Sequence, residues 1–128
     1  MKLLLDTHNF LWFISGDTRL SINARILIED VSNQLVVSIV SLCEIAIKVS
    51  IGKLNLVQPF DILIPQQIRL NEMELLGISF SHTVEVAALP LNHRDPFDRL
   101  LIAQARVEKM PIISCDTAFD TYDIERLW

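Results

Sequence analysis

Short apolar runs alternate with segments of helical periodicity along this chain, and the alternation limits the folds that it can adopt. Four runs have the length and composition of buried strands: Lys2–Leu5, Leu35–Val37, Leu75–Ile78 and Ile112–Ser114. Ile124–Leu127 is a weaker candidate for a fifth strand. Strands separated by helices pair in parallel through right-handed crossovers. The sequence therefore predicts an α/β sandwich with helices on both faces of a central parallel sheet of four to five strands.

Capping residues and helix breakers mark the intervening helices. Ser81 is placed to cap one helix, and Asp95 followed by Pro96 is a strong start signal for the last. The expected helices are Thr7–Ile14, Ser21–Asp30, a segment from Ser38 or Ser41 to Lys48, a helix with open ends around Ile62–Leu70, Ser81–Leu89, and Pro96 to about Lys109.

Length and composition indicate one domain. The chain has 128 residues, and we expect residues 1–128 to form a single domain with one hydrophobic core. The hydrophobic fraction of 51% is slightly above the usual share of about 45–50%. It fits a sheet covered on both faces or a subunit interface, and we expect a homodimer. The net charge of −5 argues against a broad basic surface, yet it is compatible with an enzyme whose acids and metals carry the local electrostatics.

No segment predicts secretion or membrane insertion. Leu3–Leu5 is too short for a signal peptide, and the apolar stretch Leu35–Ile47 is shorter than the roughly 20 residues of a membrane helix and contains Glu44. Cys43 and Cys115 lie far apart without metal-binding spacing, and are expected to be buried, reduced thiols. We therefore expect a soluble cytoplasmic protein without membrane contact.

Four carboxylates stand where apolar runs meet helix starts. Asp6 and Asp116 follow two of the expected strands, and Glu44 and Asp98 lie near the start of two helices. The carboxyl ends of parallel strands share one edge of the sheet, which is where α/β proteins bind ligands. Crowded carboxylates raise each other's pKa unless a cation compensates them. The pattern predicts a divalent metal site.

Each acid also has a purely structural interpretation. Asp6 is placed to cap the helix that follows it. Glu44 lies three residues after Ser41, the spacing of a capping box, and four before Lys48, the spacing of a helical ion pair. If Ser38 is the cap instead, Glu44 falls on the second turn and cannot complete the box, although Lys48 can still pair with it.

The two later acids have similar alternatives. Asp98 lies three residues after Asp95, so that Asp95 can cap the helix while Asp98 either interacts with the helix dipole or binds a metal. Asp116 fits the role of a turn former. Asp120 and Asp123 look like solvated acids, and whether Asp120 touches a metal stays open.

The residue types favour hydrolysis of phosphodiesters. The three histidines, His8, His82 and His93, are scattered, which disfavours zinc, and carboxylates alone favour Mg²⁺ or Mn²⁺. There is no glycine-rich phosphate loop and no Gly-x-Ser-x-Gly elbow, which disfavours nucleotide binding and acyl transfer. Two cations held by such acids would activate a water and stabilise the leaving oxygen of a phosphoryl transfer.

Four stretches of the sequence resemble a known family. They are Leu3-Leu4-Leu5-Asp6-Thr7-His8, Ser41-Leu42-Cys43-Glu44-Ile45-Ala46-Ile47-Lys48, Leu89-Pro90 with His93-Arg94-Asp95-Pro96-Phe97-Asp98-Arg99-Leu100-Leu101-Ile102-Ala103-Gln104-Ala105, and Ile113-Ser114-Cys115-Asp116. Together they resemble PIN-domain ribonucleases of the VapC toxin type, essentially from end to end. The string from His93 to Ala105 is the most specific. The resemblance implies a three-layer α/β/α fold and a Mg²⁺- or Mn²⁺-dependent endoribonuclease.

The resemblance also assigns roles by position. It implies that the catalytic and metal-binding residues are Asp6, Glu44, Asp98 and Asp116. Ser114 stands where threonine is frequent and keeps a hydroxyl near the site. Asn9-Phe10 stands where aliphatic residues are frequent, a change that alters helix packing but removes no acid.

Several cations lie near these acids in the sequence. They are candidates for contacting RNA phosphates, for orienting the acids, or for solvent-exposed and acid-pairing roles: Arg94, Arg99, Lys48 and Lys53.

The resemblance further implies partners. These are an RNA substrate cut to a 5′-phosphate and a 3′-hydroxyl, a second copy of the chain, and a cognate antitoxin. An inserted arginine or lysine of that antitoxin can compete with the metal for the carboxylates. The alternative function is a catalytically silent PIN-like module that binds a protein partner or RNA, which metal titration would distinguish.

Overall fold

Five parallel strands form the centre of the molecule. The structure is a computed structural model and describes residues 1–128. The order of the strands across the sheet is β3-β2-β1-β4-β5, and every neighbouring pair is parallel. The strands are β1 (Lys2–Leu5), β2 (Gln34–Ser38), β3 (Glu74–Leu76), β4 (Ile112–Ile113) and β5 (Arg126–Leu127). The predicted parallel sheet is confirmed, with the weaker candidate as its fifth strand.

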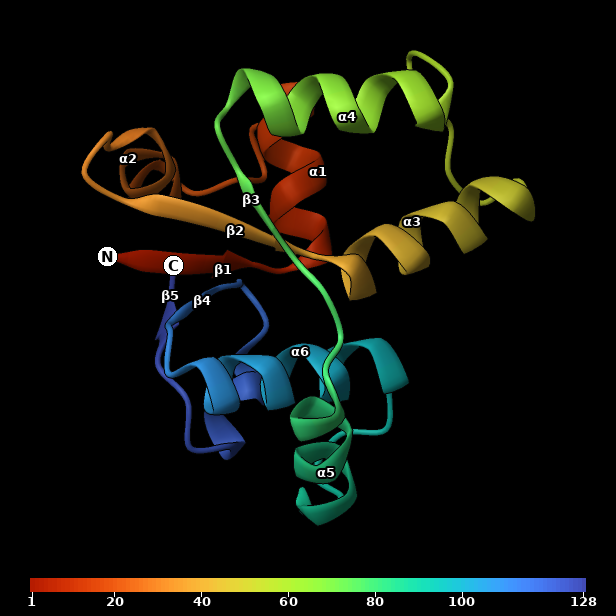
Figure 1. Cartoon of the computed structure of the whole chain (residues 1–128). Helices are drawn as coiled ribbons and strands as arrows, with labels where there is room; N and C mark the ends of the chain where they lie inside the picture. The colour runs from red at the N-terminus through yellow and green to blue at the C-terminus, as the bar shows by residue number, and fades with distance from the viewer.

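Helices cover both faces of this sheet (Figure 1). They are α1 (Thr7–Ser15), α2 (Ile22–Glu29), α3 (Ile39–Ser50), α4 (Phe60–Leu70), α5 (Phe80–Ala88) and α6 (Pro96–Glu108), with a short 3-10 helix, η1 (Thr117–Thr121). In Figure 1, α1, α2 and α4 lie on one side of the strands, and α5 and α6 on the other. This is the predicted three-layer α/β/α arrangement.

The alternation of side chains along β1 divides the interior into two cores. Leu3 and Leu5 point into the core beneath α1 and α2, whereas Leu4 points into the core beneath α6. All three side chains are fully buried, because β1 is the middle strand and is flanked by β2 and β4. A strand covered on both faces needs a continuous apolar sequence, which is what Lys2–Leu5 provides.

One predicted helix start is wrong. We expected Ser81 to cap α5, but the helix begins at Phe80 and its cap is Ser79. The backbone N–H of Ser79 donates to Nδ1 of His82, 2.9 Å away, and the Ser79 hydroxyl accepts from the His82 backbone. This is a capping box in which histidine replaces the usual glutamate or glutamine, and that replacement hides it from a sequence pattern.

The cysteines also differ from expectation. Cys43 and Cys115 are unpaired as predicted, but both are exposed, because Cys43 lies on the solvent side of α3 and Cys115 in the loop after β4. No helix of the structure combines the length and apolar character that crossing a membrane requires.

Candidate functional site

Asp6 lies at the junction between β1 and α1. Its Oδ1 accepts a hydrogen bond from the backbone N–H of Asn9 at 2.8 Å, so Asp6 is the N-cap of α1. The side chain is nevertheless buried, and burial raises the pKa of Asp6 above its usual value, although the neighbouring Ser114 and Asn9 act in the opposite direction. A cap at a helix start does not need burial, so capping alone does not account for this residue.

Asn9 contacts Asp6 a second time through its side chain. The amide Nδ2 of Asn9 donates to the same Oδ1 that accepts the backbone hydrogen bond. Asn9 is fully buried, and its own Oδ1 has no hydrogen-bond partner. Leaving this buried oxygen without a partner costs free energy. The asparagine at this position, where aliphatic residues are frequent, therefore does more than change helix packing, because its amide fixes one oxygen of Asp6.

Glu44 lies on the second turn of α3. The cap of α3 is Ser38, whose hydroxyl accepts from the backbone N–H of Val40 at 3.0 Å. The capping box with Ser41 is therefore excluded. Glu44 is buried, and its Oε2 accepts from the Lys48 ammonium at 2.9 Å, which is the helical ion pair allowed by the sequence.

Asp95 and Asp98 divide two roles at the start of α6. Oδ1 of Asp95 accepts from the backbone N–H groups of Phe97 and Asp98, so Asp95 is the cap, as predicted. The carboxylate of Asp98 is thereby left for other partners. Burial, together with the negative charges of Asp95 and Glu44, raises the pKa of Asp98 to about 6, against the opposing effect of a hydrogen bond to His93.

His93 is a site residue that the sequence interpretation missed. Its Nε2 lies 2.7 Å from Oδ2 of Asp98 and 3.9 Å from Oδ2 of Asp116. One donor atom from each of these three residues lies within 4.8 Å of the others. The His93 ring meets that of Phe119 edge-on at 6.1 Å, which restrains its orientation. The sequence signals were its place in the loop leading to Asp95 and its position at the start of the family-like string from His93 to Ala105.

Asp116 caps η1 with one oxygen and faces His93 with the other. Its Oδ1 accepts from the backbone N–H of Ala118 at 2.9 Å, so the turn-forming role is real. The buried hydroxyl of Ser114 accepts from the Asp116 backbone at 3.0 Å and so holds the turn after β4.

Arg99 braces the loop that carries His93. Its guanidinium donates to four backbone carbonyls, which are those of Val86, Leu89, Pro90 and His93. These contacts assign Arg99 a supporting role in the loop structure. Arg94, by contrast, is exposed at the protein surface.

Replacing Arg99 by Ala is expected to lower the free energy of unfolding by about 1–3 kcal/mol, because four backbone carbonyls, three of them in partly buried hydrogen bonds, lose a charged donor. The matched change Arg94→Ala should stay within about 0.5 kcal/mol, as surface substitutions usually do. Urea unfolding of the two variants measures both values. Equal stabilities would mean that the carbonyl contacts of Arg99 do not hold the loop.

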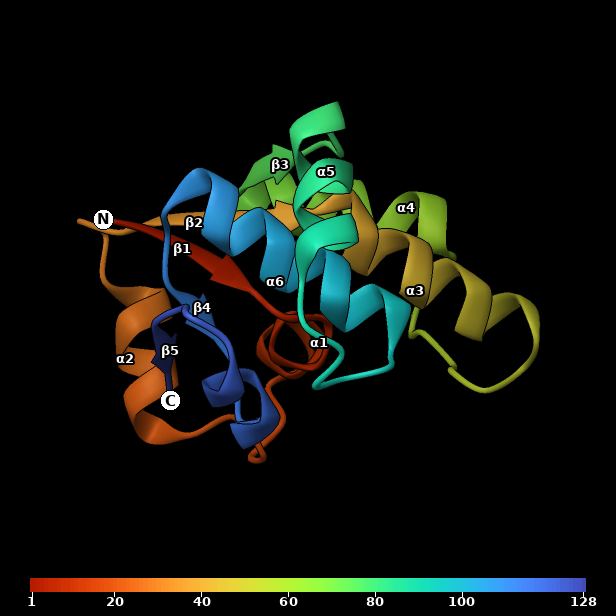
Figure 2. The ribbon, with the colours of Figure 1, turned by 90° about the horizontal axis from the view of Figure 1, so that it is seen from below.

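The acids gather at the carboxyl edge of the sheet but not at equal distances. Figure 2 shows α1 beginning where β1 ends, with α3 and α6 nearby. Asp98, Asp116 and His93 form the tight group, while Asp6 and Glu44 lie outside it. Glu44 is still close enough for its charge to raise the pKa of Asp98. Asp120 does not join them, because it pairs with Arg126 at 2.8 Å.

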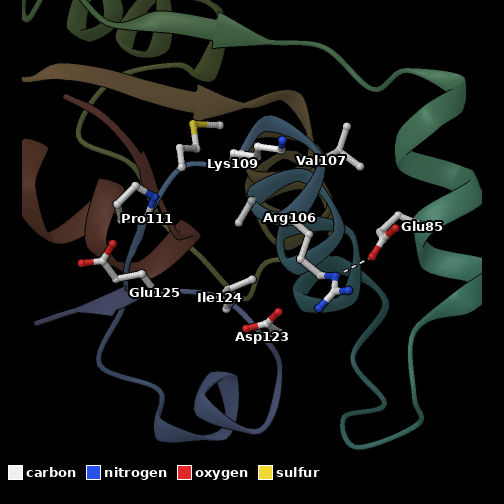
Figure 3. Close-up of a pocket in the computed structure, with 10 residues that line it drawn as sticks. Glu85, Arg106, Val107, Lys109, Pro111, Asp123, Ile124 and Glu125 are labelled. Atoms are coloured by element: carbon white, nitrogen blue, oxygen red, sulfur yellow. Dashed lines mark hydrogen bonds and ion pairs between the residues drawn. The ribbon is translucent and has the colours of Figure 1, made fainter.

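A separate pocket of about 400 Å³ lies far along α6 from Asp98 (Figure 3). It is lined by residues from the end of α6 and from the segments before β4 and β5. Its principal polar contact is the ion pair between Arg106 and Glu85, which satisfies both charges. This pocket is therefore not a candidate for the chemistry of the acids.

The donor set at the sheet edge fits a divalent cation. Two carboxylates with one imidazole are ligands that divalent first-row metals accept, and carboxylates alone suit Mg²⁺. The raised pKa of Asp98 shows that its negative charge is poorly compensated by the protein itself. A cation would remove that penalty, which is the electrostatic condition expected of a metal site.

Comparison with known proteins identifies the family. The model of the PIN domain family matches residues 3–125. No curated protein matches the sequence significantly. Several solved structures share the fold at low sequence identity. The crystal structure of VapBC2 from Rickettsia felis, bound to a DNA fragment from their promoter, contains a chain that is 17% identical with a TM-score of 0.73, and the match covers 100% of this chain and 99% of that one.

Two further solved structures give the same result. DNA-bound VapBC from Salmonella typhimurium matches at 13% identity and a TM-score of 0.72, over 99% of this chain and 97% of that one. VapBC-1 from nontypeable Haemophilus influenzae matches at 18% identity and a TM-score of 0.67, over 99% of this chain and 97% of that one. At these identities the likeness establishes the fold. Since the family model spans nearly the whole sequence, the chain belongs to the PIN domain family.

Proposed function

We propose that this protein is a Mg²⁺- or Mn²⁺-dependent endoribonuclease that acts as the toxin of a toxin-antitoxin pair. PIN domains are nucleases as a family, which supports a nuclease in general. The observation that carries the metal-dependent hydrolysis is the group of Asp98, Asp116 and His93, whose donor atoms lie within 4.8 Å of one another beside two buried acids.

The four acids have distinct parts in this proposal. Asp98 and Asp116 hold a cation directly, with His93 oriented against both, and Asp6 and Glu44 complete the negative edge. When bound, Mg²⁺ or Mn²⁺ supplies a Lewis acid for the phosphodiester and lowers the pKa of a water. Hydrolysis of RNA in this way leaves a 5′-phosphate and a 3′-hydroxyl.

The chain's own groups position these acids. Asn9 fixes Oδ1 of Asp6, Ser114 holds the backbone at Asp116, and Lys48 pairs with Glu44. Each contact reduces the freedom of a carboxylate before substrate arrives, which is how enzymes prepare a site for developing charge. Arg94, exposed beside the site, is proposed to contact RNA phosphates together with Lys48.

Partners follow from the same proposal. The matched structures are VapBC assemblies, which supports a cognate antitoxin for this chain. An arginine or lysine of that antitoxin is proposed to inhibit by pairing with the carboxylates in place of the metal. We also propose a homodimer, for which exposed apolar side chains such as Phe80 and Val84 of α5 provide surface.

Sequencing of RNA ends after brief expression tests the function. Wild-type protein is expected to generate new 5′-phosphate ends at defined sites in one class of RNA, and Asp6→Asn is expected to remove them. Asparagine can still cap α1 through its side-chain oxygen, so the helix start is preserved.

Asp123→Asn is the control for this experiment. Asp123 is exposed and lines the pocket of Figure 3, at the far end of α6, so its removal changes net charge equally without touching the proposed site. Cleavage sites that persist in Asp6→Asn would contradict the proposed function. If neither wild type nor Asp123→Asn cuts RNA although both fold, the silent-module alternative holds.

A further inference from the structure

His93 brings a nitrogen atom to a site whose other donor atoms are carboxylate oxygens. Its Nε2 lies 2.7 Å from Oδ2 of Asp98 and 3.9 Å from Oδ2 of Asp116. The two acids come from different elements, Asp98 from the first turn of α6 and Asp116 from the turn between β4 and η1. A hydrogen bond to Asp98 alone would not account for the position of the imidazole beside Asp116 as well.

The carboxylate oxygens that face His93 are those that the rest of the protein leaves free. Oδ1 of Asp116 accepts from the backbone N–H of Ala118, whereas its Oδ2 forms no hydrogen bond and lies on the His93 side. The carboxylate of Asp98 accepts from His93 only, because Asp95 is the cap of α6. Ligand atoms on one octahedral ion lie about 3 Å apart when adjacent and about 4 Å apart when opposite. The three free donor atoms lie within 4.8 Å of one another, close to that spacing.

His93 is held in place through both its backbone and its ring. The guanidinium of Arg99 donates to the backbone carbonyl of His93 at 3.2 Å. The Phe119 ring meets the imidazole edge-on, with the ring centroids 6.1 Å apart. Nδ1 of the imidazole has no hydrogen-bond partner in the protein, so it can carry the ring proton while Nε2 binds an ion. A side chain restrained in this way is prepared to act as a ligand.

We propose that Nε2 of His93 is a ligand of the cation and that this nitrogen makes the site selective for divalent transition-metal ions such as Mn²⁺ over Mg²⁺. Mg²⁺ prefers oxygen ligands, whereas transition-metal ions also accept imidazole nitrogen. A site built from carboxylates alone suits Mg²⁺ and Mn²⁺ alike. The inference rests on the proposed metal-dependent function, and it decides the choice between the two ions that the acids leave open.

Electron spin-echo spectroscopy of bound Mn²⁺ tests the ligand directly. Wild-type protein that has been treated with chelator and reloaded with Mn²⁺ is expected to show the modulation of a nitrogen bound to the ion. Protein made with ¹⁵N-histidine should show the modulation of the heavier isotope in its place, which assigns the nitrogen to an imidazole. Asp98→Asn should lose the bound Mn²⁺ signal, because it lacks one of the two carboxylates of the group.

The variant His93→Gln tests the selectivity. Glutamine offers an oxygen that Mg²⁺ accepts but no imidazole nitrogen. Mn²⁺ binding, measured from the resonance of the free ion, should weaken by roughly tenfold or more, since even the loss of a residue that only supports a ligand costs about 10–100-fold in metal affinity. Mg²⁺ binding, measured by competition with Mn²⁺, should change less. The preference for Mn²⁺ over Mg²⁺ should therefore fall.

His8→Gln is the matched control. His8 is an exposed histidine near Asp6 but lies outside the group of close donor atoms, so its replacement should preserve both the nitrogen modulation and the preference for Mn²⁺. The third histidine of the chain, His82, is buried against Glu108. Modulation that persists in His8→Gln is therefore assigned to His93 even if His93→Gln does not fold.

The nitrogen ligand is overturned if Mn²⁺ binds in a manner that depends on Asp98 but shows no nitrogen modulation, and His93→Gln binds it as wild type does. In that case RNA cleavage by wild type would leave the ribonuclease standing with an all-oxygen site. The selectivity is overturned if His93→Gln keeps the wild-type preference for Mn²⁺. Nitrogen modulation without any RNA cleavage by wild type in Mn²⁺ would support the ligand and reject the ribonuclease.

Discussion

Replacing Asp98 by Asn is expected to lower RNA cleavage by the purified protein by roughly 10²–10³-fold, the loss typical when one charge-stabilising group is removed. Asparagine keeps the size of the side chain and an oxygen that can accept from His93, but it lacks the negative charge that would hold a cation. The cap of α6 is Asp95, so the helix start is untouched. Initial rates on a defined single-stranded RNA measure the effect.

The same variant should be more stable than wild type when no metal is present. The pKa of Asp98 is about 6 in the folded protein and about 3.8 when unfolded. The stabilisation from a protonated Asp98 is therefore complete below pH 3.8 and is lost as pH rises through 6. Above pH 6 the folded wild type retains a penalised charge, which the substitution Asp98→Asn removes. After allowance for the exposed part of the side chain, we expect a gain of about 1–2 kcal/mol at pH 7.

Urea unfolding of both proteins in chelator at pH 5 and pH 7 checks this sign. The stability difference between Asp98→Asn and wild type should be larger at pH 7 than at pH 5. Asp123→Asn, which removes an exposed acid, should show no such trend. If Asp98→Asn cleaved RNA at the wild-type rate, Asp98 would have no role in the chemistry, whatever its pKa.

The framework of the fold is contained in local sequence patterns. The apolar run Lys2–Leu5 predicts a strand buried on both faces, and its central position between β2 and β4 requires that burial. Asp95 followed by Pro96 predicts the start of α6 for a local reason, because an N-cap and a proline at the first helical position act within a few residues. Patterns of this kind need no knowledge of the rest of the chain.

The site was only partly predictable for the opposite reason. Parallel topology predicts that four acids lie at the same edge of the sheet, namely Asp6, Glu44, Asp98 and Asp116. The sequence does not reveal which of these acids lie closest to one another. His93 meets Asp98 and Asp116 because Arg99 holds its loop through contacts with four carbonyls. A loop fixed by tertiary hydrogen bonds has no periodic signature. The choice between Ser38 and Ser41 as the cap of α3 likewise required the structure.

Removal of divalent cations should have the largest effect on activity. Dialysis against a chelator is expected to lower RNA cleavage by roughly 10³-fold or more, since a Lewis acid supplies several kcal/mol to such a reaction and each 1.4 kcal/mol is a factor of about ten. Addition of Mg²⁺ or Mn²⁺ should restore the rate. The reason lies in the site, where burial raises the pKa values of Asp6 and Asp98 and the protein does not fully compensate their negative charges.

A binding measurement separates this effect from any influence of cations on the RNA. At a concentration about 100 times the dissociation constant, Mn²⁺ should stabilise the chelator-treated protein by about 2.7 kcal/mol, which a thermal unfolding curve resolves. Asp98→Asn should lose most of that stabilisation, whereas Asp123→Asn should keep it. Equal stabilisation of wild type and Asp98→Asn would mean that the cation binds at another site. A metal held by Asp98 and Asp116 cannot bind equally well after one of its two carboxylates is removed.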